Sequence, residues 1–444
     1  MSSQRSSPAP SSHPLEWTGP PLTVIGICAD TPAELSQPAR QALQEAELIL
    51  GADRHLNGVS KLNLKAVTRL YPTPLGDLRD LLEHHSNERV VLLASGDPLF
   101  YGIGGFLSRI LARQHLRFLP ALSSIQVAFC RLGLCWQDAQ VVSLHGRPLQ
   151  RLRAKLGCGR TLALLTDQHS HPQAVARELH RAKLDRSTIW VCEALGSEQE
   201  RVRQFSVAEL LLNAPAIEVN PLHVTIVQTL GDGGVQPEFP GIDDRRFATG
   251  EAPGKGMISK REVRLAALSL LQPRAQDIGW DVGAGCGALA VEWARWNPLG
   301  QLYAVEHHPG RIDFLRENRD QFGVDANLRI IEGTAPAALH SLPQPHAVFI
   351  GGSDGELLSL LAYCWQQLHS GGRLVASAVT EQSRAALLAF SASEAMTNIE
   401  CEWTQLQVSR SDTLGSQLVL RPKAPVLLLC ARKPSRPPEV ITHG

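Results

Sequence analysis

A glycine-rich turn in the second half of the chain is the densest group of residues that could bind a ligand. Residues 281–287 read Asp-Val-Gly-Ala-Gly-Cys-Gly and lie between a predicted strand at 277–282 and a predicted helix at 289–296. Glycines let the backbone approach a nucleotide-like ligand, and the helix behind them directs its N-terminus at that ligand. Glu306 ends the next predicted strand, where a carboxylate can accept hydrogen bonds from both ribose hydroxyls. The pattern predicts a site for an adenosine-containing cofactor, the alternative being glycines that only permit tight strand–helix packing.

The spacing of these glycines favours one adenosine cofactor over another. The motif is G-x-G-x-G rather than the G-x-G-x-x-G of dinucleotide-binding proteins, and two extended runs, 399–409 and 425–433, follow the fifth predicted strand. Both features favour S-adenosylmethionine over NAD. Residues 332–336, Glu-Gly-Thr-Ala-Pro, are then expected to flank the adenine, unless they form an ordinary strand-to-helix turn.

A cluster of charges precedes the glycine-rich turn. The stretch Ser259-Lys-Arg-Glu-Val-Arg264 opens a predicted helix, with Ser259 as its N-cap and Glu262 as the partner in a capping box. Arg261 and Arg264 are one turn apart and are predicted to share a face. A solvated helix start is the ordinary interpretation, and only a substrate rich in carboxylates would favour a binding role.

The first half of the chain has its own glycine-rich loop, residues 95–105, which begins Ser-Gly-Asp-Pro and follows a predicted strand at 89–94. Gly96 permits an unusual φ and Pro98 fixes one, so the loop should form a rigid turn at the carboxyl end of a strand, where α/β proteins bind ligands. No Gly-Lys-Ser or Gly-Lys-Thr follows, which excludes a P-loop.

The elements that position these motifs alternate in the manner of an α/β fold with parallel strands, starting at residue 22. Further strands are predicted at 140–144, 161–165, 188–193 and 223–229. Gly, Pro and Asp break every periodicity in the segment 232–254, which we interpret as a linker. The prediction is a disordered tail at 1–20, a first domain at 21–231, a second domain at 255–432 and a second tail at 433–444.

Composition excludes several classes of protein. The chain has 444 residues, with 43 Lys and Arg against 43 Asp and Glu, so no overall field draws it to nucleic acid or to an anionic membrane. Nine cysteines without a C-x-x-C pair predict reduced thiols, no metal and a cytoplasmic protein. We find no apolar run of transmembrane length and no signal peptide.

Taken together, the motifs resemble known families. In the first half, the resemblance is to the tetrapyrrole methylases of the cobalamin pathway, and it rests on the motifs Val24–Ile27, Gly51–His55, Ser95–Pro98, Ala121–Ile125 and Cys192–Gly196. Residues 256–287, with the later Glu332–Pro336 and Phe349–Ser353, resemble a Rossmann-like methyltransferase of seven strands that also decarboxylates its macrocycle. The resemblance spans about residues 21–432. It implies a methylase fold of two α/β subdomains followed by that second domain.

The resemblance also implies an activity. Two S-adenosylmethionine sites would serve methyl transfer to carbons 5 and 15 of a precorrin, a reduced tetrapyrrole, with carbon dioxide lost from the acetate at carbon 12. The cofactor-binding residues it implies are Ser95, Gly96, Asp97, Ser123 and Ser124 in the first domain, and Ser259, Gly283, Ala284, Gly285, Cys286, Gly287, Glu306 and Ala335 in the second. Catalytic residues stay unassigned. The candidates for binding substrate carboxylates or moving a proton are Arg54, His55, Arg261 and Arg264. Cys28-Ala29-Asp30 departs from the glycine-rich turn that many relatives carry after the first strand.

Other interpretations stay open at this point. One is methylation of RNA, which the neutral charge and the 5% aromatic content disfavour. Another is a first domain that binds S-adenosylmethionine without catalysis. We expect a small-molecule partner, no nucleic acid or membrane, and a homo-oligomer.

Overall fold

The computed structural model describes residues 14–28, 35–212, 217–233 and 235–435, and the chain forms two compact units. The first unit comprises residues up to 147 together with 158–180 and 184–231. The second comprises residues 148–157, 181–183 and everything from 232 onward. No helix in the described ranges is long and apolar enough to cross a membrane.

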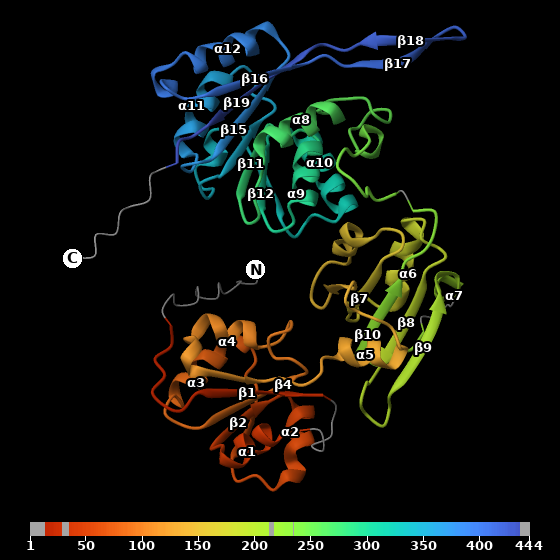
Figure 1. Ribbon diagram of the computed structural model, residues 1–444, viewed down its shortest axis with the longest axis vertical. Coiled ribbons are helices and arrows are strands. Elements are labelled where there is room, and N and C mark those ends of the chain that lie inside the picture. The colour runs from red at the N-terminus through yellow and green to blue at the C-terminus, as the bar shows by residue number, and fades with distance from the viewer. Residues whose placement is uncertain (1–13, 29–34, 213–216, 234, 436–444) are drawn as a thin grey trace, which may run out of the picture. The chain divides into compact units, whose positions relative to one another are not determined.

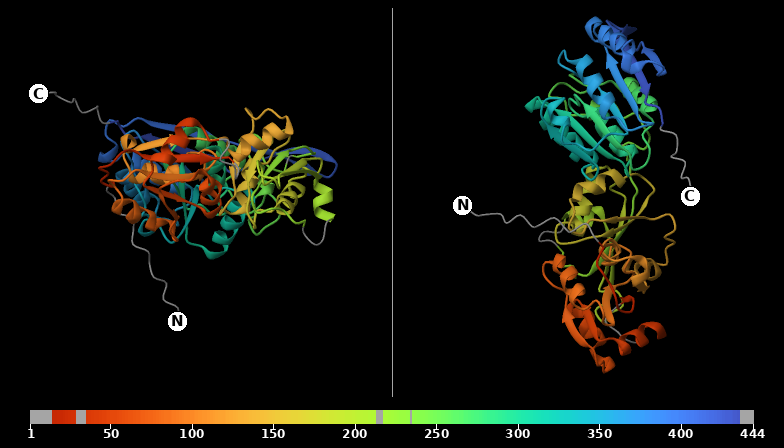
Figure 2. Two further views of the ribbon diagram at one scale, coloured as in Figure 1. Left: turned by 90° about the horizontal axis from the view of Figure 1, so that it is seen from below. Right: turned by 90° about the vertical axis from the view of Figure 1, so that its left-hand side faces the viewer.

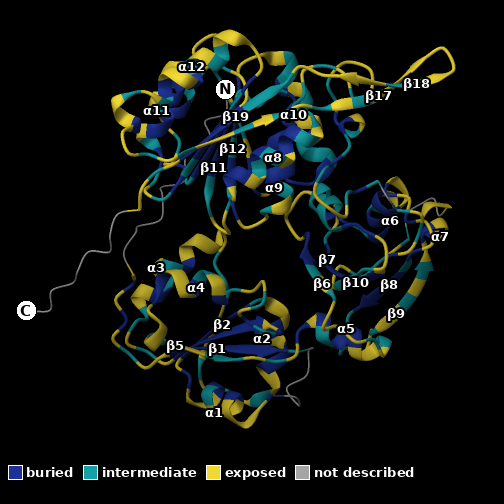
Figure 3. Cartoon of the chain, turned by 45° about the horizontal axis from the view of Figure 1, so that its top comes forward, coloured by how far each residue is buried: buried dark blue, intermediate teal, exposed yellow. Residues whose placement is uncertain are grey.

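A parallel sheet of five strands forms the first half of the first unit, in the order β3-β2-β4-β1-β5 (Figure 1). Its strands are β1 (Leu22–Ile27), β2 (Leu48–Gly51), β3 (Val67–Leu70), β4 (Val90–Ser95) and β5 (Leu116–Leu119), and its helices are α1 (Gln37–Glu45), α2 (Asp53–Val59), α3 (Leu78–His84) and α4 (Gly104–Ile110). Every residue of β1 is buried because apolar clusters cover both faces of the sheet (Figure 3). Because all five strands run parallel, their carboxyl ends lie at one edge of the sheet, which carries the loop that begins at Ser95.

A second, mixed sheet completes the first unit, in the order β6-β7-β10-β8-β9. It consists of β6 (Gln140–Ser143), β7 (Thr161–Leu165), β8 (Thr188–Glu193), β9 (Arg201–Ser206) and β10 (His223–Gln228), with helices α5 (Ser124–Leu132), α6 (Pro172–Arg181) and α7 (Val207–Leu212). Only β6 and β7 run parallel. The four strands predicted here are confirmed within one residue, whereas β9 was not predicted because charged residues interrupt its apolar pattern.

The second unit is a seven-stranded sheet in the order β13-β12-β11-β14-β15-β19-β16. Its strands are β11 (Ile278–Val282), β12 (Gln301–Glu306), β13 (Leu328–Glu332), β14 (Ala347–Ile350), β15 (Arg373–Ala378), β16 (Cys401–Leu406) and β19 (Val426–Arg432), and its helices are α8 (Arg261–Leu271), α9 (Ala288–Trp296), α10 (Pro309–Phe322), α11 (Leu357–Gln367) and α12 (Glu381–Ser391). Five parallel strands followed by an antiparallel pair match the predicted Rossmann-like domain.

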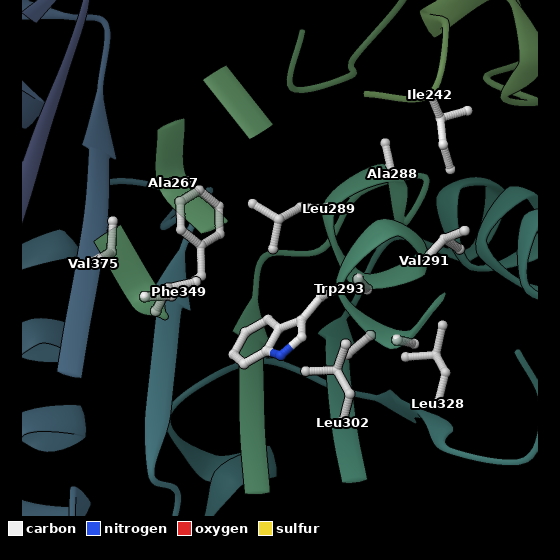
Figure 4. Packing of buried hydrophobic residues seen from close by; sticks show 14 of the residues in the cluster. Ile242, Ala267, Ala288, Leu289, Val291, Trp293, Leu302, Leu328, Phe349 and Val375 are labelled. Carbon is white, nitrogen blue, oxygen red and sulfur yellow. The ribbon is translucent and has the colours of Figure 1, made fainter. Parts of the chain in front are cut away.

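Helices cover both faces of this sheet (Figures 1 and 2). Helices α8, α9 and α10 enclose one apolar cluster, in which Trp293 lies next to Leu302 (Figure 4). Helices α11 and α12 enclose the other. Because both faces are buried, the carboxyl ends of the parallel strands are the edge that presents polar groups to a ligand.

A two-stranded ribbon, β17 (Ser409–Leu414) and β18 (Gln417–Pro422), interrupts the terminal strand pair and was not predicted. It projects from the seven-stranded sheet as a largely exposed arm (Figures 1 and 3). Polar and apolar residues alternate too irregularly in its sequence to predict two strands. The alternation is irregular because no apolar core covers the ribbon.

The structure corrects three predicted segment boundaries. Leu15 and Trp17 are buried in the first apolar cluster, so residues 14–20 do not belong to a disordered tail; residues 1–13 lie outside the described ranges. Within the expected linker, Ile242 and Phe247 belong to the core of the second unit. At the other end, Lys433 Nζ donates to the carbonyl of Leu368 over 2.7 Å, and residues 436–444 lie outside the described ranges. These segments are ordered because apolar or hydrogen-bonding partners from distant sequence cover them.

Limited proteolysis tests the boundary between the two units. Gln236 is buried and donates to the Gln321 carbonyl, the Pro237 carbonyl accepts from Arg295, and Gly241 N–H donates to Glu292. The first cut is therefore expected beside Glu238 and Phe239, which are exposed between these anchored residues. The measurement is mass spectrometry of fragments after brief digestion with subtilisin. A first cut inside residues 281–287 or 95–98 would contradict the predicted boundary.

Candidate functional site

A cavity of about 570 Å³ lies at the carboxyl edge of the parallel sheet in the first unit. Its walls come from the ends of β1 and β5 and from the loop after β4, including Cys28, Asp97, Leu119 and Ala121. The volume is within the range of small-ligand sites. The sequence motifs Val24–Ile27, Ser95–Pro98 and Ala121–Ile125 each contribute residues to this cavity, whereas Leu119 was not singled out. Ala29 and Asp30, in the turn that departs from the glycine-rich pattern of many relatives, lie outside the described residues.

Close backbone packing forms this edge. Gly96 N–H donates to the carbonyl of Ile27 over 2.8 Å, and the Gly96 carbonyl accepts from Ala121 N–H over 3.2 Å. A Cβ atom on Gly26 would lie 1.8 Å from the Gly96 oxygen, so only glycine fits there. Gly96 has φ +57°, as its sequence context predicted. Asp97 Oδ1 accepts from Leu99 N–H over 2.9 Å, which leaves the rest of the carboxylate at the cavity.

The two serines predicted to bind cofactor have different roles. Ser123 is the N-cap of α5, and its buried hydroxyl forms a capping box with Gln126. Its hydroxyl and its backbone N–H are both paired with Gln126, whose Oε1 accepts from that N–H over 2.9 Å, so neither donor is available to a ligand. Ser124, the first residue of the helix, is exposed.

Arg54, His55 and Ser95 meet where β2 and β4 end. Arg54 Nη2 donates to Ser95 Oγ over 2.6 Å, and Arg54 Nε donates to His55 Nε2 over 3.3 Å. His55 Nε2 and Ser95 Oγ are 3.1 Å apart. His55 is 8% exposed, whereas Arg54 and Ser95 are exposed. The structure thus joins two motifs that are 40 residues apart in the sequence.

In the second unit, each glycine of the turn after β11 has its own reason to be glycine. Gly283, Gly285 and Gly287 all have positive φ, between +60° and +78°. A Cβ on Gly283 would collide with the backbone of Gly352, and one on Gly287 with the side chain of Leu315. A Cβ on Gly285 would meet only the Met257 oxygen, at 3.6 Å. Packing therefore explains the outer two glycines, and Gly285 is the position open to a ligand. Ala284 beside it is half-buried, whereas Cys286 is buried.

Glu306 at the end of β12 is buried and already hydrogen-bonded. Its Oε2 accepts from Gly285 N–H over 2.8 Å, and its Oε1 accepts from the N–H groups of His307 and His308, each over 2.9 Å. A carboxylate has about four acceptor positions, so one remains, on Oε2. Glu306 can therefore accept one ribose hydroxyl rather than the two that were expected, and it also fixes the shape of the glycine turn.

Asp281 lies beneath the turn as a buried carboxyl group, 1% exposed. Burial raises its pKa to about 7, with a smaller contribution from the charge of Glu306, while a hydrogen bond from Ala290 N–H acts in the opposite direction. Its Oδ2 has no hydrogen-bond partner among the described residues.

Stability should depend on pH through Asp281. Its pKa of about 7 in the folded protein exceeds the ordinary value near 4, so the folded state binds the proton more tightly and stability falls as pH rises from about 4 to 7. Asp281→Asn, which keeps an acceptor for Ala290 N–H, should remove this slope. We expect the variant to gain about 1–2 kcal/mol relative to wild type between pH 5 and pH 7. Urea unfolding without cofactor measures it, with exposed Asp313→Asn as the control. Parallel pH profiles of wild type and Asp281→Asn would contradict the assignment.

The helix predicted at about 260–271, with Ser259 as its N-cap, spans Arg261–Leu271, and the predicted capping box is wrong. The N-cap is Lys260, without a side-chain cap, and Asp244 Oδ1 accepts from Arg261 N–H over 3.0 Å. A carboxylate from earlier in the chain therefore replaces the local cap. Ser259 is half-buried, and its carbonyl accepts from Arg264.

Arg264 is not available to a substrate, which corrects the prediction that it binds substrate carboxylates. It is 0% exposed and forms ion pairs with Asp244, at 2.6 Å, and with Glu292, at 2.9 Å. Sequence reasoning missed both partners because Asp244 lies in the presumed linker and Glu292 in an apolar helix. Arg261 is exposed and keeps the candidate role.

Ala335 follows β13 and is half-buried against the second apolar cluster. His307 Nδ1 lies 3.4 Å from Asp354 Oδ2, so the loops after β12 and β14 meet at the same edge as the glycine turn. Among the described residues, no group of His, Cys, Asp and Glu could hold a metal ion. The second site is thus built from the ends of β11, β12 and β14.

Comparison with known proteins matches each unit to a protein family. The family described as Tetrapyrrole (Corrin/Porphyrin) Methylases matches residues 21–211, and the one described as Precorrin methyltransferase domain matches residues 253–433. A cobalt-precorrin-6B C(15)-methyltransferase (decarboxylating) of Salmonella typhimurium is 34% identical over 43% of this chain and 96% of its own length. The crystal structure of precorrin-6y C5,15-methyltransferase from Geobacter metallireducens covers 44% of this chain and 98% of its own, with 32% identity and a TM-score of 0.40. A precorrin-6Y C(5,15)-methyltransferase [decarboxylating] of Sinorhizobium sp is 37% identical over 409 residues, which are 92% of this chain and 95% of that protein. With identity of this degree along nearly the whole length of both chains, the chain belongs to the family of decarboxylating precorrin-6Y C(5,15)-methyltransferases.

Proposed function

We propose that this chain is an S-adenosylmethionine-dependent enzyme that methylates carbons 5 and 15 of a precorrin and removes carbon dioxide from its acetate side chain at carbon 12. The main support is that each unit has a candidate ligand site of its own at the carboxyl ends of parallel strands. The chain is also similar to such an enzyme over 92% of its length. Two separate edges suit two methyl transfers.

We assign carbon 5 to the first unit, and carbon 15 with decarboxylation to the second. Support comes from the Salmonella relative, whose name specifies carbon 15 and decarboxylation and which matches 43% of this chain. A Precorrin methyltransferase domain at residues 253–433 supports the same division.

The residues present fit S-adenosylmethionine, which supplies an electrophilic methyl group when bound. In the second unit, Gly285 gives the backbone access and Glu306 accepts from one ribose hydroxyl. In the first unit, the loop at Ser95–Asp97 and the backbone of Ser124 would hold it. These groups contribute proximity, alignment and exclusion of water. The exposed guanidinium groups of Arg54 and Arg261 suit substrate carboxylates.

Asp97→Ala should impair methylation by the first unit without unfolding it. Loss of the carboxylate at the cavity is expected to weaken binding of S-adenosylhomocysteine to the first unit by about 10–150-fold, as for a hydrogen bond to a charged group. Asp97→Asn keeps the oxygen that accepts from Leu99 N–H and so isolates the charge, and exposed Asp77→Ala is the control. Unchanged affinity by calorimetry and unchanged label at carbon 5 would make the loop structural only.

We also propose that the chain assembles with copies of itself through the ribbon β17–β18 and acts on a small molecule in the cytoplasm, without nucleic acid or membrane. Leu414, Leu418 and Leu420 on the ribbon are 63–75% exposed, whereas Arg410 of β17 joins the ribbon to the second unit through Asp244 and Glu262. Light scattering of Leu418→Asp/Leu420→Asp should report a smaller assembly than wild type. Equal mass for both would reject the ribbon as the contact.

The reaction itself is tested by mass spectrometry. Wild-type enzyme is incubated with the precorrin substrate and methyl-labelled S-adenosylmethionine, and the product is weighed and fragmented. Two labelled methyl groups with loss of carbon dioxide are expected. A single methyl group, or none, would overturn the proposal for one unit or both.

A further inference from the structure

The cluster of Arg54, His55 and Ser95 fixes the positions of its own hydrogen atoms. A guanidinium group has only N–H donors, so His55 Nε2 and Ser95 Oγ, which face Arg54 Nε and Nη2, must both accept. The contact of 3.1 Å between Ser95 Oγ and His55 Nε2 can then be satisfied only by the hydroxyl proton of Ser95. This arrangement requires a neutral His55 with its proton on Nδ1, whose single Nε2 lone pair is shared between Arg54 Nε and the Ser95 hydroxyl.

This arrangement lies beside the cavity of the first unit. Ser95 is paired with Ile27 in the register of β4 and β1, and both Ile27 and Asp97 line the cavity. The Ser95 hydroxyl is exposed at this edge, whereas His55 is 8% exposed behind it. A ligand can thus contact Ser95 directly and His55 only through Ser95.

Methylation at carbon 5 requires a proton acceptor, and this step rests on the function proposed above. The bridging carbon of a tetrapyrrole carries one hydrogen. When the carbon forms its bond to the methyl group, the methyl–sulfur bond breaks with its electron pair on sulfur, and the macrocycle becomes a cation that still holds that hydrogen. Restoring the double bond requires loss of the hydrogen as a proton.

We propose that Ser95 is the catalytic residue that removes this proton, and that His55 and Arg54 are the positioning residues that enable it to do so. Ser95 Oγ takes the proton from carbon 5 while its own proton passes to His55 Nε2, and the C–H electron pair returns to the macrocycle. His55 then releases a proton to solvent, which restores the starting state.

Arg54 serves this relay in two ways. Its positive charge stabilises negative charge that develops on Ser95 Oγ, and it opposes protonation of His55 before the substrate reacts. A cationic macrocycle is a strong carbon acid, so the cluster needs correct placement more than basicity.

The first test reads the hydrogen positions without any reaction. Nitrogen-15 NMR of histidine-labelled full-length protein is compared between wild type and His55→Gln, which identifies the His55 signals by difference. We expect a protonated Nδ1 and an unprotonated Nε2, the reverse of the tautomer that predominates in free histidine. A protonated Nε2 at neutral pH would overturn the relay.

The second test separates proton removal from binding. His55→Gln and Ser95→Ala should each lower kcat for carbon-5 methylation by about 100-fold. Each should also slow several-fold further when carbon 5 carries deuterium, because proton removal becomes rate-limiting. Methylation at carbon 15 should not change in either variant. The KM for S-adenosylmethionine should not change in His55→Gln, because a ligand reaches His55 only through Ser95. His84→Gln, an exposed histidine of α3, is the control and should behave as wild type.

Each outcome decides between the two proposals. Wild-type enzyme that leaves carbon 5 unmethylated refutes the function of the first unit. Wild-type enzyme that methylates it, with Ser95→Ala and His55→Gln retaining wild-type kcat, refutes the relay alone. A loss of kcat in the variants with no deuterium effect would mean that the cluster only holds α2 against β4. If His55→Gln does not fold, exposed Ser95→Ala gives the same decision.

Discussion

Arg264→Ala is expected to lower the free energy of unfolding of the second unit by about 3–5 kcal/mol, the usual effect of removing one partner from a buried ion pair. The Arg264 side chain is 0% exposed, and its donors contact two carboxylates, of Asp244 and Glu292, and two carbonyls, of Ile242 and Ser259. It also lies over the ring of Phe247, with 4.9 Å to the ring centroid. Without Arg264, Glu292 loses its counter-charge and Asp244 keeps only Arg410, whose Nη1 lies 2.9 Å from Asp244 Oδ2.

Hydrogen exchange measured by mass spectrometry on peptides of α8 and α9 reports this loss within the full-length chain. Arg261→Ala is the matched control, since that arginine is on the same helix but exposed, and its nearest carboxylate, of Glu262, is 3.7 Å away. We expect the control to change stability by less than about 0.5 kcal/mol. Equal losses in the two variants would contradict a special role for the buried network.

Glu306→Gln is expected to weaken binding of S-adenosylhomocysteine to the second unit by about 10–150-fold, the equivalent of one hydrogen bond to a charged group. The amide of glutamine cannot accept from Gly285 on one side and from His307 and His308 on the other, because one of its two ends is a donor. The glycine turn therefore loses support at the same time as the cofactor loses an acceptor. Methylation at carbon 15 should fall at limiting cofactor, and so should loss of carbon dioxide if the two steps are coupled.

Glu332→Gln is the control for this variant. Glu332 ends the next strand in register with Glu306, but it is exposed and paired with Arg316 at the surface. The product of each variant is weighed after reaction with labelled cofactor, and carbon-5 methylation serves as the internal reference. Wild-type affinity and wild-type label at carbon 15 in Glu306→Gln would reject Glu306 as a cofactor ligand. Decarboxylation that continues while carbon-15 methylation falls would show that the two steps are independent.

The local motifs were the most predictable part of the molecule. The glycine turn at 283–287, the acidic strand end at Glu306 and the rigid loop at Ser95–Pro98 follow from requirements that act within a few residues: positive φ, the reach of a carboxylate, a fixed φ at proline. Strand positions followed equally well wherever both faces are buried, because such strands are continuous apolar runs.

Only the tertiary structure decided which of these side chains are free to contact a ligand. Arg261 and Arg264 look equivalent in sequence, yet one is exposed and the other is enclosed by Asp244 and Glu292, which lie 20 and 28 residues away along the chain. Glu306 could serve two hydroxyls in principle, but three backbone amides take most of its acceptor positions. Ser95 and His55 are separated by 40 residues and meet only through the register of β2 and β4. Short-range backbone requirements are written in neighbouring residues and can be predicted from them, whereas burial and hydrogen-bond satisfaction depend on partners that folding brings from elsewhere in the chain.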